Sequence, residues 1–129
     1  MLGELAGRPV QVTFVPHLLA VNRGIVSTMY MKLTGGFGEP EVRKLFDDFY
    51  RSEPFVKLLP QGAVANLKNV KYSNYCHISL HTDPRTNRLI VVSTLDNMVK
   101  GAAGQAIQNM NLALGLEEAA GLRMVPPAF

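Results

Sequence analysis

The chain has 129 residues, of which 47% are hydrophobic and 18% charged, with a formal net charge of +3. This balance predicts one domain with a real core, and no apolar run approaches the roughly 20 residues that a membrane-spanning helix needs. The basic residues are scattered, which argues against nucleic-acid binding. The single cysteine, Cys76, excludes an internal disulfide and a CxxC metal site and fits a reducing, cytoplasmic setting.

The first half of the chain predicts two strands and a helix. Pro9–Val15 alternates apolar and polar side chains, which indicates a strand with one buried face. Gly24–Leu33 is rich in β-branched and aromatic residues and predicts a second, longer strand. After a glycine-rich loop, an amphipathic helix is expected over residues 39–55, and its apolar face consists of Val42, Leu45, Phe46 and Phe49.

The second half predicts a short extended piece, a hairpin and a final helix. Residues 54–62 are expected to be extended between two prolines, and residues 74–95 to form a hairpin that turns at Asp83–Asn87. The final helix is expected from about Met98 to Leu114. This order predicts an α+β fold over residues 1–129, with a mainly antiparallel sheet and helices on one face.

The beginning of the final helix is unusual because Gly101 and Gly104 fall in its first turns. Each glycine costs a helix roughly 1 kcal/mol relative to alanine. One interpretation is tight packing against another element; the other is a ligand lying against the free amides of the helix N-terminus. Asp96 or Asn97 can cap the helix. Further along, an apolar stripe is expected from Ile107, Met110 and Leu114.

Few other residues suggest chemistry. Arg23 directly precedes the second predicted strand and either clamps a carboxylate or phosphate or is a solvated strand-end arginine. His77 and His81 are roughly 13 Å apart on a strand, too far for one metal ion, and no metal site is expected. Cys76 falls on the apolar side of its strand and is interpreted as a small buried hydrophobe.

Three blocks resemble one family: FVPHLLAVNRGIVSTMY, SNYCHI and VVSTLDNMVKGAAGQAIQNMN. They are similar to the C-terminal part of the N-acetyl-gamma-glutamyl-phosphate reductase family, the arginine-biosynthesis branch of the semialdehyde dehydrogenase superfamily. The resemblance runs from about Gly7 to Leu122. It implies an NADP-dependent oxidoreductase that reduces N-acetylglutamyl 5-phosphate to the semialdehyde through a cysteine thioester. It also implies an α+β domain resembling that of glyceraldehyde-3-phosphate dehydrogenase, and a homo-oligomer.

The resemblance also implies site residues. Asn97 and Gly101, with Ala102 behind them, would approach the nicotinamide end of NADP. Arg23 would contact an anionic group of the acyl-phosphate substrate, and His17 would face the active-site cleft. Ser73 and Asn74 match a family block without an assigned role, and Cys76 does not match the family nucleophile.

The sequence departs from the family because the Rossmann half, the nucleophilic cysteine and its histidine motif are not in it. We therefore expect a C-terminal domain that is inactive alone, whose helix at residues 97–115 would pack on the missing Rossmann domain. A lysine-pathway aminoadipyl-phosphate reductase of the same superfamily is one alternative. The other is a non-catalytic dimerisation domain, which would associate through one face of the strand at 24–33: Val26, Thr28 and Tyr30, or Ile25, Met29 and Met31.

Overall fold

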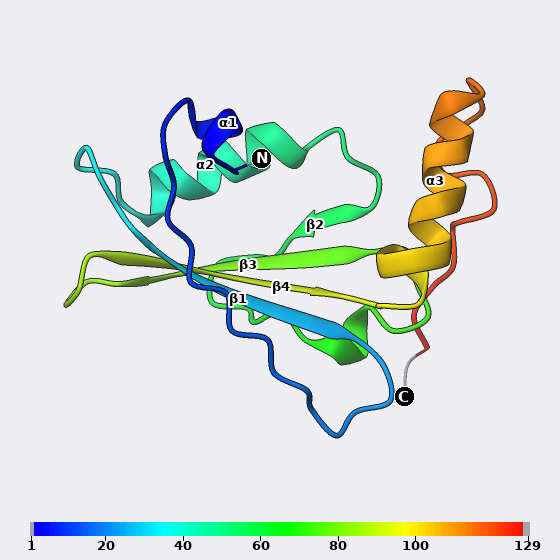
Figure 1. Ribbon diagram of the computed structural model, residues 1–129, viewed down its shortest axis with the longest axis horizontal. Helices are drawn as coiled ribbons and strands as arrows, with labels where there is room; N and C mark the ends of the chain where they lie inside the picture. Colours follow the sequence, from blue (N-terminus) through cyan, green and yellow to red (C-terminus); the bar gives the residue numbers. More distant parts are fainter. Residues whose placement is uncertain (1, 128–129) are drawn as a thin grey trace.

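The computed structural model describes residues 2–127, in which a four-stranded sheet carries one helix on a face and another beyond one end (Figure 1). The elements in chain order are α1 (Leu2–Ala6), β1 (Ile25–Lys32), α2 (Glu39–Tyr50), β2 (Val56–Leu58), the 3₁₀ turn η1 (Leu67–Asn69), β3 (Cys76–Asp83), β4 (Arg88–Leu95), the π-helical turn η2 (Val99–Ala103) and α3 (Gly104–Ala113).

The sheet has the order β1-β4-β3-β2. β4 pairs antiparallel with both β1 and β3, whereas β2 pairs parallel with β3. The expected α+β fold with a mainly antiparallel sheet is confirmed. Residues 54–62 were expected only to be extended. Within them, Val56–Leu58 form a strand, which is the parallel edge strand of the sheet.

The β3–β4 hairpin has the predicted turn and alternation. Leu80 lies opposite Val91 in the register, so their side chains share a face of the sheet. Together with Ile78 and Leu89 they form the main core, which Val42 of α2 closes. The hairpin therefore supplies most of the surface on which α2 packs.

Helix α2 begins after Gly38, whose amide donates to the Glu41 carboxylate at 2.9 Å. Val42 is buried, and Phe46 and Tyr50 also pack on the core. The predicted apolar face is wrong in two positions, because Leu45 and Phe49 are exposed. The helix packs through the row at intervals of four residues, and the positions at i+3 and i+7 point away from the sheet.

The predicted strand at Pro9–Val15 is not present, since residues 9–15 have no regular secondary structure. Phe14, the largest side chain of its apolar face, is 82% exposed. Among residues 2–127, the sheet order places no strand next to this segment. Alternation alone does not make a strand, because the backbone groups need a neighbouring strand to bond with.

The chain after α3 returns and packs against the segment before β2. Phe55, Ala119 and Leu122 form a second buried cluster, with Tyr75 against it. Within residues 2–127, no helix combines the length and the apolar character needed to cross a bilayer.

Candidate functional site

The end of β4 is organised by the carboxylate of Asp96, whose residue has 0% exposed surface. One oxygen, Oδ1, accepts from the amides of Met98 at 2.8 Å and Val99 at 3.1 Å, and so caps the following helical turn. The other, Oδ2, accepts from the amide of Tyr72 at 2.6 Å. Of the two predicted caps, Asp96 is therefore the one that holds the helix.

Arg23 completes this arrangement. Its Nε lies 2.8 Å from Oδ2 and 3.1 Å from Oδ1 of Asp96, and its guanidinium stacks 4.5 Å above the centre of the Tyr72 ring. Burial acts to raise the pKa of Asp96, but the bonds from three backbone amides and from Arg23 hold that pKa below its ordinary value. The carboxylate is therefore charged at neutral pH and fixes Arg23 in place.

Asn97 ties the beginning of β1 to the same point. Its Oδ1 accepts from the amide of Gly24 at 2.7 Å. Gly24 has a φ of +117°, and a Cβ there would come within 2.4 Å of a Leu67 methyl carbon, so only glycine fits. We call the set Arg23, Gly24, Asp96, Asn97 and Tyr72 the strand–helix junction. It brings together Arg23 and Asn97, two of the predicted site residues.

The two glycines at the helix start play different parts. Gly104 is buried, and a Cβ there would lie 2.4 Å from Asn74 Oδ1 and 2.8 Å from the Val99 carbonyl oxygen. Gly101 is exposed, and a Cβ there would meet its nearest neighbour, a Leu95 methyl carbon, at an ordinary 3.4 Å. Tight packing therefore explains Gly104, whereas the surface at Gly101 is open.

Helix α3 turns its predicted apolar stripe outward. Ile107, Met110 and Leu114 are 39%, 49% and 68% exposed, so the apolar stripe faces away from the rest of the described chain. The buried positions of α3 are Gly104, Gln108 and Asn111. Polar and small side chains therefore hold the helix to its own domain, and the packing of its apolar stripe on another domain stays a prediction.

Those buried amides are almost fully hydrogen-bonded. Gln108 Oε1 accepts from Asn74 Nδ2 at 3.0 Å and from Lys100 Nζ at 2.6 Å, and Gln108 Nε2 donates to Glu118 at 2.6 Å. Asn111 Nδ2 donates to two carbonyls of the returning chain. Asn74 Oδ1 has no hydrogen-bond partner among the described residues and faces the Cα hydrogen of Gly104.

The structure thus gives Asn74 a packing role that its sequence block did not indicate. Ser73 has a similar local role, because its Oγ donates to the Val70 carbonyl at 2.7 Å and accepts from the Tyr75 amide. Two residues organise the junction beyond what the sequence indicated. Asp96 was predicted only as a helix cap, and Tyr72, which has a φ of +62°, was not singled out. No glycine or proline lies next to Tyr72, so the strongest turn signals did not mark it.

The other candidates lie apart from the junction. Ala102 is exposed on the open helix start beside Gly101. His17 is exposed in the irregular segment, where its Nδ1 lies 3.1 Å from the Val15 carbonyl oxygen. Among residues 2–127, no hydrogen bond or ion pair joins His17 to the junction.

Cys76 packs partly buried against the core, as its position in the strand indicates. Burial raises the pKa of the Cys76 thiol, with Lys100 acting in the opposite direction. Burial, together with Lys57, lowers the pKa of His77. Within the described part of the chain, no group of three His, Cys, Asp or Glu is placed to hold a metal ion.

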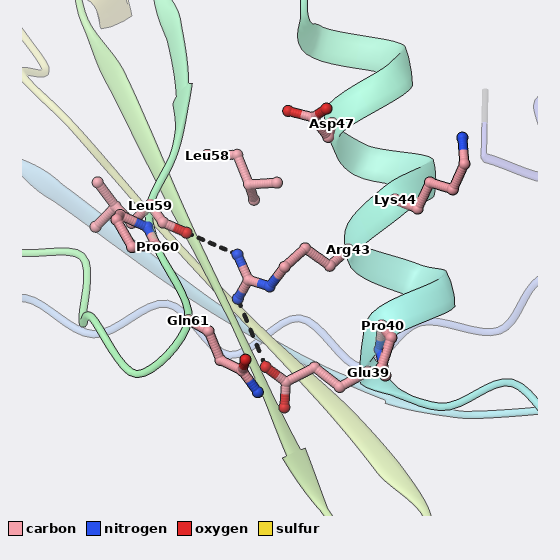
Figure 2. A pocket seen from close by; sticks show the side chains of 9 residues that line it. All are labelled: Glu39, Pro40, Arg43, Lys44, Asp47, Leu58, Leu59, Pro60 and Gln61. Atoms are coloured by element: carbon pink, nitrogen blue, oxygen red, sulfur yellow. Dashed lines mark hydrogen bonds and ion pairs between the residues drawn. The ribbon is translucent and has the colours of Figure 1, made fainter.

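A hollow of about 540 Å³ lies between α2 and the chain that follows β2 (Figure 2). Arg43 spans it, donating through NH1 to the Leu59 carbonyl at 2.8 Å and pairing through NH2 with Glu39 at 3.5 Å. Its lining residues include none of the junction. These contacts hold α2 on the sheet, and we assign the hollow to that attachment.

Comparison with known proteins gives one family match and strong relatives. The family described as semialdehyde dehydrogenase, dimerisation domain, matches residues 1–97. The chain is 60% identical over 129 residues to the N-acetyl-gamma-glutamyl-phosphate reductase of Brachyspira hyodysenteriae, and 53% identical over 128 residues to that of Clostridium beijerinckii. Each alignment covers 99% of this chain and 37% of the relative. The chain therefore spans little more than a third of the length of the curated relatives it matches.

Proposed function

Because the chain belongs to the semialdehyde dehydrogenase dimerisation-domain family, we propose that it is the C-terminal part of an NADPH-dependent reductase that converts N-acetylglutamyl 5-phosphate to the 5-semialdehyde. The observation that carries this proposal is the 60% identity over essentially the whole chain to a reductase of that name. The arginine-pathway substrate is preferred over the aminoadipyl phosphate for the same reason.

The strand–helix junction supports a binding role for this end of the sheet. Asn97 accepts from Gly24 through Oδ1, so its Nδ2 is the group that it offers to a ligand. Gly101 and Ala102 continue from Asn97 as an exposed surface without large side chains. A flat ring fits against such a surface, and we propose that the nicotinamide lies there. When bound, NADPH supplies the hydride for the reduction.

Arg23 is proposed as the substrate-side cation. Both of its contacts with Asp96 use Nε, so the terminal nitrogens remain as a fork that suits a carboxylate or a phosphate. Asp96 and Tyr72 limit its rotamers, which reduces the entropy lost on binding an anion. His17 is proposed to face the active-site cleft on the resemblance alone, because its segment has no regular secondary structure.

The exposed stripe of α3 supports the proposal that a Rossmann domain packs on it. A contiguous apolar patch of this kind, here Ile107, Met110 and Leu114, marks a surface that meets another protein surface. The two-thirds of each relative that lies outside this chain is long enough to contain such a domain.

The test uses the complete reductase with Gly101→Val. A branched side chain on the open helix start should raise the KM for NADPH or lower kcat by about tenfold or more, whereas Tm should change by only a few degrees, because no close neighbour is displaced. The exposed Ala120 offers a matched control, and Ala120→Val should change neither kinetic constant.

Two results would count against different parts of the proposal. Unchanged KM and kcat in the Gly101 variant would remove the nicotinamide from this surface. If the complete wild-type enzyme does not reduce N-acetylglutamyl phosphate, or prefers the acetylated aminoadipyl phosphate, the assigned reaction itself is wrong. The 129-residue chain alone should show no turnover in the same assay.

A second function is favoured by the exposure of β1, all eight residues of which are exposed. We propose that β1 contributes to a homodimer, as the family description suggests. Of its two faces, the one with Met29 and Met31 shares a side with α2, and the one with Val26 and Tyr30 lies on the other side. If the face with Val26 and Tyr30 forms the interface, Tyr30→Asp should lower the dimer fraction in light scattering. If the face with Met29 and Met31 forms it, Met29→Asp should lower that fraction instead. A wild-type chain that stays monomeric as its concentration rises would contradict the role.

A further inference from the structure

A second hollow, of about 280 Å³, opens beside the ring of Tyr72. It is formed by η1 and the turn after it, by the end of the irregular segment and by the returning C-terminal chain. η1 lies across the sheet from α2 (Figure 1). The walls combine apolar and basic groups: Val21, Leu67, Pro127, Lys68, Lys71 and Tyr72.

The charge of this hollow is unbalanced. Lys68 and Lys71 are three residues apart on one turn, and no Asp or Glu lines the hollow with them. Among residues 2–127, neither lysine forms an ion pair. The nearby carboxylate of Asp96 is already engaged by Arg23 and three amides. Two like charges around one opening repel each other, and a bound anion relieves that repulsion.

The walls are also fixed before any ligand arrives. The amide of Lys71 donates to the Leu67 carbonyl at 3.1 Å, and the amide of Lys68 donates to Asn66 Oδ1 at 2.9 Å. Tyr72 is held by its amide bond to Asp96 and by the guanidinium of Arg23 on its ring. A site built on ordered backbone loses little entropy when it binds.

We propose that this hollow binds a small phosphate ester, with the ammonium groups of Lys68 and Lys71 on the phosphate oxygens. Charge-assisted bonds to phosphate are the strong ones available to lysine, and the apolar wall with the Tyr72 ring accommodates the organic part of the molecule. The proposal does not depend on the reductase reaction, because none of its lining residues is assigned to the nicotinamide or to the fork of Arg23.

The experiment titrates the 129-residue chain with inorganic phosphate and with phenyl phosphate at constant ionic strength, and follows the backbone amides by NMR. Saturable shifts are expected at residues 66–72. Lys68→Ala and Lys71→Ala should each weaken the binding by about fivefold or more, the factor that one lost charged contact of about 1 kcal/mol gives. Lys32→Ala, which removes the same charge at the far end of β1, is the control and should not weaken it.

Three results would overturn the site. The first is the absence of saturable shifts with either phosphate in a chain whose amide spectrum is well dispersed. The second is an equal loss of affinity in the Lys32 control, which would show general charge attraction. The third is an equal response to phenol, which has the ring but not the phosphate. A lysine variant with wild-type amide dispersion and wild-type affinity would remove that lysine from the site.

Discussion

Replacing Asp96 by alanine is expected to destabilise the chain by about 3 kcal/mol in urea unfolding. The substitution removes the cap of the helical turn, leaves the Tyr72 amide without its acceptor, and leaves Arg23 without its partner. Loss of the cap together with one partner of a partly buried ion pair is among the few mechanisms that give a change of this size. Arg23→Ala should have a smaller effect, because the carboxylate then keeps its three amide donors.

The matched control is Asp47→Ala on α2. Asp47 pairs with Arg51 across exposed side chains, and exposed pairs contribute about 0–1 kcal/mol. If Asp96→Ala and Asp47→Ala change the free energy of unfolding by similar amounts, the junction does not organise this end of the sheet.

The same carboxylate predicts a pH dependence. Its pKa is lower in the folded chain than the ordinary value near 3.9, so its contribution is fully present above that value and is lost as the pH falls through the folded pKa. Asp96→Asn keeps the shape but not the charge. The difference in unfolding free energy between wild type and Asp96→Asn should therefore shrink on acidification from pH 7 to pH 3, and a constant difference would contradict the assignment.

Gly104→Ala is expected to cost about 2–3 kcal/mol, a value typical of forcing an extra carbon into a filled site. The new Cβ would collide with the Val99 carbonyl oxygen, which is backbone, and with Asn74, which is anchored to Gln108. Gly101→Ala is the contrasting change. It meets no neighbour closer than 3.4 Å and gains helix propensity, so it should be neutral or stabilising by up to about 1 kcal/mol.

Thermal unfolding of both variants in the 129-residue chain separates the two glycines. A stabilised or unchanged Gly104 variant would mean that Asn74 and Val99 move aside easily. A strongly destabilised Gly101 variant would return that position to the packing interpretation and weaken the case for a ligand there.

The sequence pattern correctly predicted those elements whose pairing partners lie close by in the chain. The hairpin at residues 76–95 has both strands and its turn in one continuous stretch, so its register follows from alternation. The start of helix α2 was predicted correctly because its start signals are local, whereas its end was not, because the helix stops at Tyr50 and not at Phe55. Arg23 and Asn97 were singled out separately, and their meeting through Gly24 depends on the pairing of β1 with β4.

Two apolar patterns have no packing partner among residues 2–127. Pro9–Val15 has the pattern of a strand but no neighbour to bond with. The stripe Ile107, Met110 and Leu114 has the pattern of a packing face, and it does not pack on this domain. Periodicity shows that a face is apolar but does not identify what covers it. The buried amides Gln108 and Asn111 gave no such signal, because polar residues are usually read as exposed.

The hydrogen bonds of Gln108 and Asn111 have a consequence for how α3 meets a partner. These bonds fix the helix to its own domain through directional contacts, while its apolar stripe stays exposed. A partner that docks there meets an ordered surface, and the association loses little conformational freedom of the helix. For the partner domain proposed above, we therefore expect docking of two ordered surfaces rather than the folding of a segment upon contact.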